Sequence, residues 1–359
     1  MSLLRNAEKS GGGQRCSNIE LLRIISMLMI VAHHYVVNSG LLSCIDAQNN
    51  LHFKDYFLLV FGWAGKTGIN IFVIITGYFM CTSNITKKKF GKLLAELYFY
   101  KIVLWSIFLL TRYEPFSIKG FLDMIFPFFT VADNFVSCFL LFYLLIPFIN
   151  KLIQALTEKE HLRLMIWCLG VYVVLPSFAK AHVVFNYITW FSVLYIVASY
   201  IRLYPKYWFD NIKITGTFMF LSLILSWLSV VILARLSIIV GKNIGIAYFF
   251  VVDSNKILAF LTAISAFLFF KNLKIGYNKM INTIAASTFG VLLIHANSDT
   301  MRQWLWKDVC NNVGVYEFGK VIPHAIISVV LIYTVCTVID IFRIKFIETP
   351  FMKKFKYLC

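Results

Sequence analysis

The chain has 359 residues, of which 60% are hydrophobic and only 14% are charged, and its mean hydropathy is +0.77. A soluble domain is roughly 45–50% apolar and about 25% charged, so the polar residues that would coat a water-soluble fold of this size are missing. The composition excludes a soluble enzyme, a disordered protein and a disulfide scaffold. It predicts an all-α protein that crosses a membrane several times.

Ten apolar runs approach the length of about 20 residues that a helix needs to cross a bilayer. They are continuous, whereas the strands of a membrane barrel alternate apolar and polar residues. We expect about ten transmembrane helices, over residues 20–38, 57–81, 93–111, 134–150, 164–179, 184–201, 215–234, 246–270, 283–297 and 321–342. The run 121–131 is too short to span and contains Pro127, which predicts an interfacial or re-entrant segment.

The distribution of charge predicts the orientation of these helices. The formal net charge is +17, from 34 Lys and Arg against 17 Asp and Glu, an excess that on a soluble protein would suggest nucleic acid. With a cytoplasmic N-terminus, 21 basic residues fall in segments inside the cell and nine fall outside, as expected for cytoplasmic loops that face anionic lipid. We therefore expect the lipid bilayer as partner, no nucleic acid, and both termini in the cytoplasm.

This orientation divides the chain into three parts. A cytoplasmic tail of residues 1–19 precedes a membrane domain of residues 20–342, and a basic cytoplasmic tail follows at residues 343–359. The eight cysteines are scattered and form no CxxC pair, so we expect neither a disulfide framework nor a metal site.

The first helix carries the strongest functional signal, because ionisable side chains within a membrane span are costly and are functional candidates by default. Arg23 and His34 are eleven residues apart, which puts them on one helix face, separated by roughly 16 Å along the axis. Glu20 lies three residues before Arg23 and can pair with it. The alternative is a snorkelling arginine and a structural histidine. The aligned pair favours a site with an anion-binding end and a proton-transfer end.

Other candidates have weaker signals. Lys66 and Asn70 are four residues apart in the second run, so both can face one cavity, although helix packing explains them equally well. His295 ends the ninth run toward the outside, where it can contact an acceptor, but a lone histidine there is more often structural. Tyr143 can belong to a sugar-stacking surface, although packing is the more common role of aromatic residues in such a chain.

The sequence resembles the integral-membrane acyltransferase family 3, whose members O-acetylate sugars and other acceptors. Several separated stretches carry the resemblance in the right order: Glu20 to His34, Gly65 to Phe72, Thr76-Gly77-Tyr78, the basic run Lys87-Lys88-Lys89, Phe142 to Asn150, and Ser287 to His295. Thr76 stands where the family usually has Ser, Asn134 where Trp is frequent and Leu292 where Tyr is common. These departures concern acceptor binding more than the type of reaction.

The resemblance implies a membrane O-acyltransferase of the bacterial plasma membrane. Its donor would be cytoplasmic acetyl-CoA, used as a co-substrate with no permanently bound cofactor, and its acceptor a hydroxyl of a cell-envelope polysaccharide or a lipid-linked sugar. An acyl-histidine intermediate is an alternative to direct transfer. A different class of function is a multi-pass transporter or a flippase-like component of polysaccharide export. Association into a homo-oligomer also stays open.

The resemblance also assigns roles to residues. His34 would be the general base, with Glu20 as the second member of the catalytic set. Coenzyme A is anionic, so Arg23, Arg15 and the run Lys87, Lys88 and Lys89 would bind it, with arginine the better bidentate partner of phosphate. The acceptor would contact residues from four separate helices, namely Lys66, Asn70, Thr76, Tyr143 and His295.

Overall fold

The computed structural model describes residues 15–126, 135–179 and 186–351, and in these residues all regular secondary structure is helical. This confirms the all-α prediction. The helices that build the fold are α2 (Ser17–Val37), α3 (Leu41–Asp46), α4 (Phe53–Gly62), α5 (Gly65–Met80), α6 (Lys87–Leu110), α7 (Ile118–Ile125), α8 (Phe135–Ala155), α9 (Glu158–Leu169), α10 (Leu175–Phe178), α11 (Tyr187–Leu203), α12 (Tyr207–Asp210), α13 (Ile212–Ile239), α14 (Ile257–Asn272), α15 (Lys279–Ala286), α16 (Thr288–His295), α17 (Asp299–Gln303), α18 (Asn312–Glu317) and α19 (Val321–Arg343).

The described helices make the chain a multi-pass membrane protein. Seven helical segments are long and apolar enough to cross a bilayer, and eight if a pair bent by 93° near residues 296–298 counts as one span. The apolar helices α11 and α14 are shorter than these seven. Every one of the ten predicted runs contains helix, but only seven of them meet the length and hydropathy of a span, with α4 and α5 counted together as one.

Three of the predicted runs are interrupted. The run 57–81 is divided between α4 and α5 at Trp63 and Ala64, and the run 246–270 is α-helical only from Ile257. The run 283–297 is divided between α15 and α16 at Ser287. Broken helices leave backbone polar groups without helical partners, so they are tolerated at membrane depth only inside protein or beside a polar cavity. These interruptions therefore point to the polar interior of the molecule.

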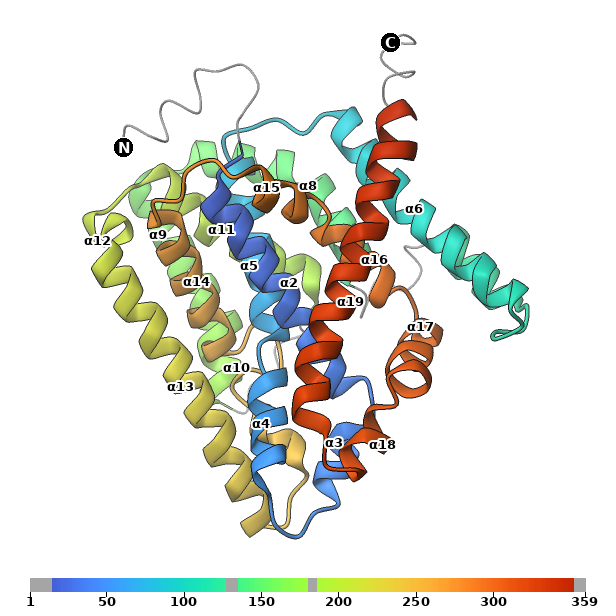
Figure 1. Cartoon of the computed structure of the whole chain (residues 1–359). Helices are drawn as coiled ribbons and strands as arrows, with labels where there is room; N and C mark the ends of the chain where they lie inside the picture. Colours follow the sequence, from blue (N-terminus) through green and yellow to red (C-terminus); the bar gives the residue numbers. More distant parts are fainter. Residues whose placement is uncertain (1–14, 127–134, 180–185, 352–359) are drawn as a thin grey trace.

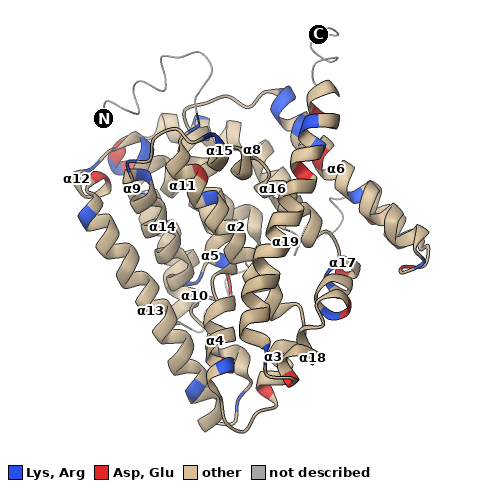
Figure 2. Cartoon of the chain, in the orientation of Figure 1, with Lys and Arg blue, Asp and Glu red and all other residues tan. Residues whose placement is uncertain are grey.

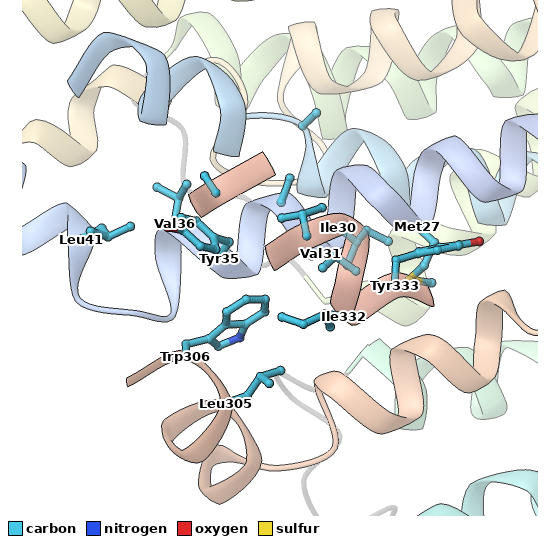
Figure 3. Close-up of a cluster of buried hydrophobic side chains, with 14 of the residues drawn as sticks. Met27, Ile30, Val31, Tyr35, Val36, Leu41, Leu305, Trp306, Ile332 and Tyr333 are labelled. Atoms are coloured by element: carbon cyan, nitrogen blue, oxygen red, sulfur yellow. The ribbon is translucent and has the colours of Figure 1, made fainter. Parts of the chain in front are cut away.

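Helix α2 lies in the middle of the bundle and packs against α4, α5, α14, α15, α16 and α19 (Figure 1). Its apolar face joins the hydrophobic cluster of Figure 3, where Tyr35 meets the buried Trp306 ring with centroids 5.8 Å apart. Gly68 allows α5 to approach α2 closely, because the Cβ atom of any other residue at this position would lie 2.6 Å from the Ser26 carbonyl oxygen. The helix with the strongest functional signal is thus surrounded by other helices.

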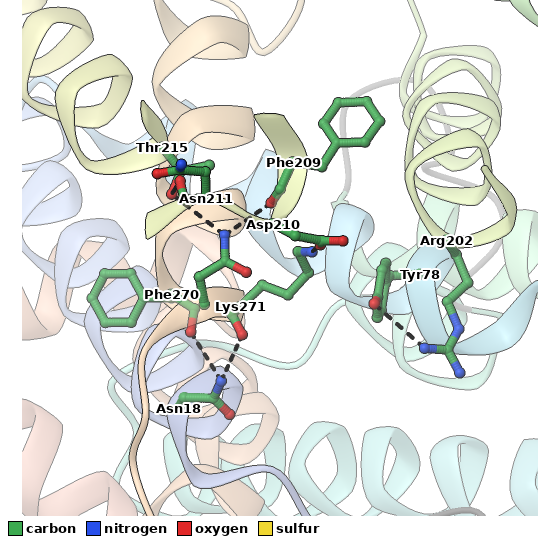
Figure 4. A network of polar contacts seen from close by, with 10 residues as sticks. Asn18, Tyr78, Arg202, Phe209, Asp210, Asn211, Thr215, Phe270 and Lys271 are labelled. Atoms are coloured by element: carbon green, nitrogen blue, oxygen red, sulfur yellow. Dashed lines mark hydrogen bonds and ion pairs between the residues drawn. The ribbon is translucent and has the colours of Figure 1, made fainter. Parts of the chain in front are cut away.

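Polar contacts hold the end of the bundle at which α2 begins (Figure 4). The Asn18 side-chain amide donates to the carbonyl oxygens of Phe270 and Lys271 at 3.0 and 3.1 Å, which caps the C-terminal end of α14. At the same end, Arg202 donates to the Tyr78 hydroxyl at 3.4 Å. These contacts fix the start of α2 against its neighbours.

A buried ionic network joins α19 to α6. Arg343 lies 3.0 Å from Glu96, 2.7 Å from Asp340 and 2.8 Å from Glu348. Asp340 also accepts from the Tyr100 hydroxyl at 2.7 Å. Burial of several charges is acceptable only when they are paired in this way, so the network fixes the tilted helix α6 to the bundle.

Lys and Arg gather where α2 begins and α19 ends, and these two ends lie on the same side of the molecule (Figures 1 and 2). This agrees with the predicted orientation, which stays a prediction. After Arg343 the chain remains helical through a π-turn, Ile344–Glu348, to Phe351. Residues 343–351 of the predicted C-terminal tail thus continue the last helix, whereas residues 1–14, 352–359, Pro127 and Asn134 lie outside the described residues.

Candidate active site

A cavity of about 880 Å³ opens beside the second half of α2. Its walls come from α2, α5, α6, α11, the segment 245–252 and the break between α16 and α17. The volume falls in the range of small-molecule sites, about 300–1,000 Å³. His33, His34, Lys66, Tyr187 and Arg302 bring ionisable and hydrogen-bonding groups to the walls.

The central feature of this cavity is a chain of hydrogen bonds through two histidines. His34 Nδ1 lies 3.0 Å from His295 Nε2, and His295 Nδ1 lies 2.6 Å from the Val291 carbonyl oxygen. The carbonyl only accepts, so His295 Nδ1 carries the hydrogen, and in the neutral ring its Nε2 then accepts from His34 Nδ1. With both rings neutral, the lone pair of His34 is left on Nε2. This is the arrangement of a general base whose tautomer is fixed by a second residue.

The breaks and glycines of the local sequence produce this arrangement. His295 is the last residue of α16, and the chain turns away after it toward α17. Gly290 allows α16 to approach α19, because the Cβ atom of any other residue at this position would lie 2.3 Å from the Asp340 side chain. His33 occupies the space left by Gly65, where a Cβ atom would be 2.3 Å from the His33 ring, and its Nδ1 donates to the Gly62 carbonyl oxygen at 2.6 Å.

Two cationic side chains also line the cavity. Lys66 donates to the Tyr187 hydroxyl at 2.8 Å, which holds its ammonium group at the wall. Arg302 forms an ion pair with Asp299 at the start of α17. The cavity therefore combines a base with nearby positive charge, a combination that stabilises negative charge developing on a substrate.

The predicted anion-binding residues lie at the other end of the Arg23–His34 face. Glu20 Oε2 is 3.9 Å from Arg23 Nε and 3.7 Å from Arg15 Nη1. Arg15 also donates to the Asn282 carbonyl oxygen at 3.3 Å. Among the described residues, neither Arg23 Nε nor the buried Asn282 Nδ2 has a hydrogen-bond acceptor. Asn282 Nδ2 is thus a donor without an acceptor, and Arg23 Nε has only its ion pair with Glu20.

The structure separates the members of the predicted site. Glu20 belongs with the arginines rather than with His34, which is fourteen residues and about 21 Å further along the helix. Arg23 does not line the cavity of His34. Lys87, Lys88 and Lys89 are exposed at the start of α6, on the side of the molecule at which α2 begins (Figure 2).

The predicted acceptor-binding residues also divide. Lys66 lines the cavity, and His295 contacts His34 instead of facing outward. Asn70 is fully buried. Its side-chain oxygen accepts a hydrogen bond from the Trp190 indole, and its amide nitrogen donates to the Ser254 carbonyl oxygen. Thr76 donates to the Phe72 carbonyl oxygen of its own helix, and Tyr143 stacks on Phe90 with centroids 6.2 Å apart. Asn70, Thr76 and Tyr143 do not line this cavity.

Sequence reasoning does not select four residues that line the cavity: Lys101, Asp123, Tyr187 and Arg302. Lys101 has a usable signal, since it is a cation within the predicted third span. Arg302 is assigned to an outside loop, and nothing in the sequence shows that this loop folds back beside His34. In the described residues, no group of three or more His, Cys, Asp or Glu side chains is placed to hold a metal ion.

The fold and the site together define a multi-pass membrane protein with a hydrogen-bonded pair of histidines, the half-buried His34 and the buried His295, at a polar cavity. A family model described as an acyltransferase domain, that of acyltransferase family 3, matches residues 17–341. The chain therefore belongs to acyltransferase family 3, and its resemblance to that family in separate motifs is confirmed over most of its length. No curated protein and no solved structure matches the chain.

Proposed function

We propose that this protein is a membrane O-acetyltransferase that moves an acetyl group from acetyl-CoA to a hydroxyl of a cell-envelope polysaccharide or a lipid-linked sugar. Membership of the acyltransferase family supports acyl transfer. The observation that carries the proposal is the hydrogen-bonded chain from His34 through His295 to the Val291 carbonyl, at the wall of a cavity large enough for a substrate.

The proposed reaction is direct transfer. His34 Nε2 removes the proton of the acceptor hydroxyl while the hydroxyl oxygen bonds to the carbonyl carbon of the thioester. The carbon–sulfur bond then breaks, and the thiolate of coenzyme A takes the proton back from His34, so that the products are the acetyl ester and free thiol. General-base assistance of this kind contributes about 10²–10⁴-fold in rate.

The cations in the cavity have a role in the same step. The carbonyl oxygen becomes negative when the acceptor oxygen adds, and a positive group beside it lowers the barrier. Lys66 is held at the wall by Tyr187. Arg302 is on α17, which follows α16 and His295 after the non-helical residues 296–298, and it also lines the cavity. We assign the stabilisation of this oxyanion to Lys66 and Arg302.

The donor would bind from the end of α2 that carries Arg15 and Arg23. Their guanidinium groups, with the free amide donor of Asn282, offer charge-assisted hydrogen bonds to the phosphates of coenzyme A. The rise of the helix puts Arg23 about 16 Å from His34 along the axis, a distance that the extended arm of coenzyme A would bridge. The exposed run from Lys87 to Lys89 would add attraction for the anionic donor.

The proposed acceptor belongs to the cell envelope, and the proposed location is the bacterial plasma membrane. The cavity reaches Asn38 and Leu42, beyond the end of α2 that is opposite the arginines. An acceptor from the outer side would therefore meet His34 without passing the donor site.

Thiol release by the purified protein tests this function. With acetyl-CoA and an envelope glycan present, free thiol and an acetylated glycan, detected by mass, should appear in equal amounts. Omission of either substrate should reduce thiol release to the hydrolysis background. Movement of glycan across vesicles without thiol release would contradict the proposal and favour the transporter.

A further inference from the structure

A second, smaller cavity adjoins the one that contains His34. Its volume is about 270 Å³, and it lies between α6, α7 and the start of α17. The two cavities are adjacent, because both are lined by Lys101, Asp123, Asn297, Ser298 and Asp299. The residues assigned to the proposed reaction, His34, His295, Lys66 and Arg302, do not line the smaller cavity.

Helix α7 is fixed in place by hydrogen bonds to its main-chain oxygens, and the Lys101 ammonium lies near the Asp123 carboxylate without a hydrogen bond to it. Tyr98 donates to the Ile125 carbonyl oxygen at 2.9 Å, and Lys101 donates to the main-chain oxygen of Asp123 at 3.1 Å. The loop before α7 is tied to the other wall, because Tyr113 donates a hydrogen bond to Asp308. This bond raises the pKa of Tyr113 to about 12, so the hydroxyl keeps its proton, and the tie, below that pH.

The walls of the smaller cavity combine carboxylates with an aromatic side. Asp123 and Glu114 are half-buried, and neither carboxylate has a hydrogen-bond or ion-pair partner among the described residues. Trp105 and the buried Phe108 form the apolar part of the wall. The Trp105 ring is supported by Phe116 and Phe121, with centroids 6.1 and 6.0 Å away.

This chemistry selects a neutral, hydroxyl-rich ligand. Ionised carboxylates only accept hydrogen bonds, so Asp123 and Glu114 need donors, and sugar hydroxyls supply them beside an aromatic face. Glu114 and Asp123 are balanced by Lys101 and Lys119, and Asp299 is paired with Arg302, so the wall has no net positive charge that would favour a phosphate or an acidic sugar. The volume is below the usual range for drug-sized ligands and suits a single sugar ring.

We propose that this cavity is a subsite for a second sugar of the acceptor, next to the sugar that is acetylated at His34. The proposal rests on the proposed function, since the first sugar is placed by the acetylation site. It commits the enzyme to an acceptor of two or more linked neutral sugars, with Asp123 and Glu114 as hydrogen-bond acceptors and Trp105 as the stacking surface.

Acceptor kinetics test the subsite. Asp123→Asn and Glu114→Gln keep the shape of each side chain and remove its charge, and Glu317→Gln, an exposed change on α18, is the matched control. We expect each subsite variant to raise KM for a neutral oligosaccharide about five- to tenfold, as expected when a neutral hydrogen bond replaces a charge-assisted one. Neither kcat nor the KM for the corresponding monosaccharide should change in Glu114→Gln, because Glu114 lines only the smaller cavity, whereas Asp123 also lines the cavity of His34. Equal changes for both acceptors, or no change, would overturn the subsite, and a loss confined to amino sugars would show a cation site instead.

Direct binding separates the subsite from the chemistry. The oligosaccharide should bind to His34→Ala as it does to the wild type, and more weakly to His34→Ala carrying Trp105→Ala. If no acetyl transfer occurs but this binding difference is found, the proposed function fails and the subsite stands. If transfer occurs and the binding difference is absent, the subsite fails alone.

Discussion

At the scale of single residues, the role of His34 depends on the atom that faces its Nδ1. His295 accepts there only because its own Nδ1 is committed to the Val291 carbonyl. The two rings lie 5.1 Å apart between centroids, tilted by 44°. Under the proposed function, His295 is therefore a positioning residue that fixes the tautomer of the proposed base, His34.

Substitution of His295 tests this role. His295→Phe removes the acceptor for His34 Nδ1, whereas His295→Gln keeps a side-chain oxygen that can accept. We expect kcat to fall about 100-fold in the phenylalanine variant, which is within the contribution of a positioned base, and to recover in part in the glutamine variant. The KM for acetyl-CoA should stay the same in both.

Two outcomes would contradict a positioning role. If both variants have the kcat of the wild type, the hydrogen bond is not used in the reaction. If both lose folded protein equally, His295 is only a packing residue. Size-exclusion profiles and acetyl-CoA binding measured beside kcat separate these cases.

The sequence predicts part of this site for a clear physical reason. Helical periodicity alone aligns Arg23 with His34 and pairs Glu20 with Arg23, because the three residues share one helix. The partner of His34 is 261 positions away in the sequence, and only tertiary packing brings it near. Asn70 has the same spacing from Lys66 that a shared cavity requires, but its amide is consumed by Trp190 and Ser254.

At the scale of elements, the contact between α2 and α5 positions the histidines. Gly65 and Gly68 lie three residues apart on the α5 face toward α2, and their missing side chains leave room for His33 and for the backbone at Ser26. Small residues allow this close approach in membrane bundles. The break between α4 and α5 also presents the Gly62 carbonyl oxygen to His33.

Gly68→Ala tests the close approach. The added methyl group would meet the Ser26 carbonyl oxygen at 2.6 Å, so the helices must separate, at a cost of about 1–3 kcal/mol. We expect a lower midpoint of thermal unfolding and reduced transfer activity. Gly91→Ala on α6 is the control, since nothing lies within 4 Å of its Cβ position, and it should unfold at or slightly above the wild-type temperature. Unfolding of both variants at the wild-type temperature would show that the approach is not tight.

The elements themselves could be predicted better than their interruptions. Apolar runs mark the helices because a membrane span needs about 20 apolar residues. The breaks depend on polar partners elsewhere in the fold. For example, Lys256 immediately precedes α14 and donates to the Pro176 carbonyl oxygen at 2.7 Å. The local sequence does not predict this contact, because its two residues are 80 positions apart.

At the scale of the whole molecule, the proposed function gives the two ends of the α2 face to different substrates. Lys and Arg gather at the end of the bundle where α2 begins (Figure 2), and Arg15 and Arg23 belong to that end in the sequence. The cleft of His34 is lined by the second half of α2 and reaches Asn38 and Leu42 beyond its other end. The net charge of +17 therefore has two uses under the proposed function: it orients the chain in the bilayer and attracts an anionic donor to one side. The acceptor, with its second sugar, approaches from the other.

The most direct test of this account is the rate of acetyl transfer by His34→Ala, measured as thiol release and as acetylated glycan in the same samples. His52→Ser is the matched control, because His52 is the exposed N-cap of α4 and serine is a preferred N-cap residue. The account predicts that His34→Ala loses at least about 100-fold in kcat, still binds acetyl-CoA and folds normally, while His52→Ser keeps the wild-type rate. A folded His34→Ala protein that transfers acetyl groups within a few fold of the wild-type rate would contradict it.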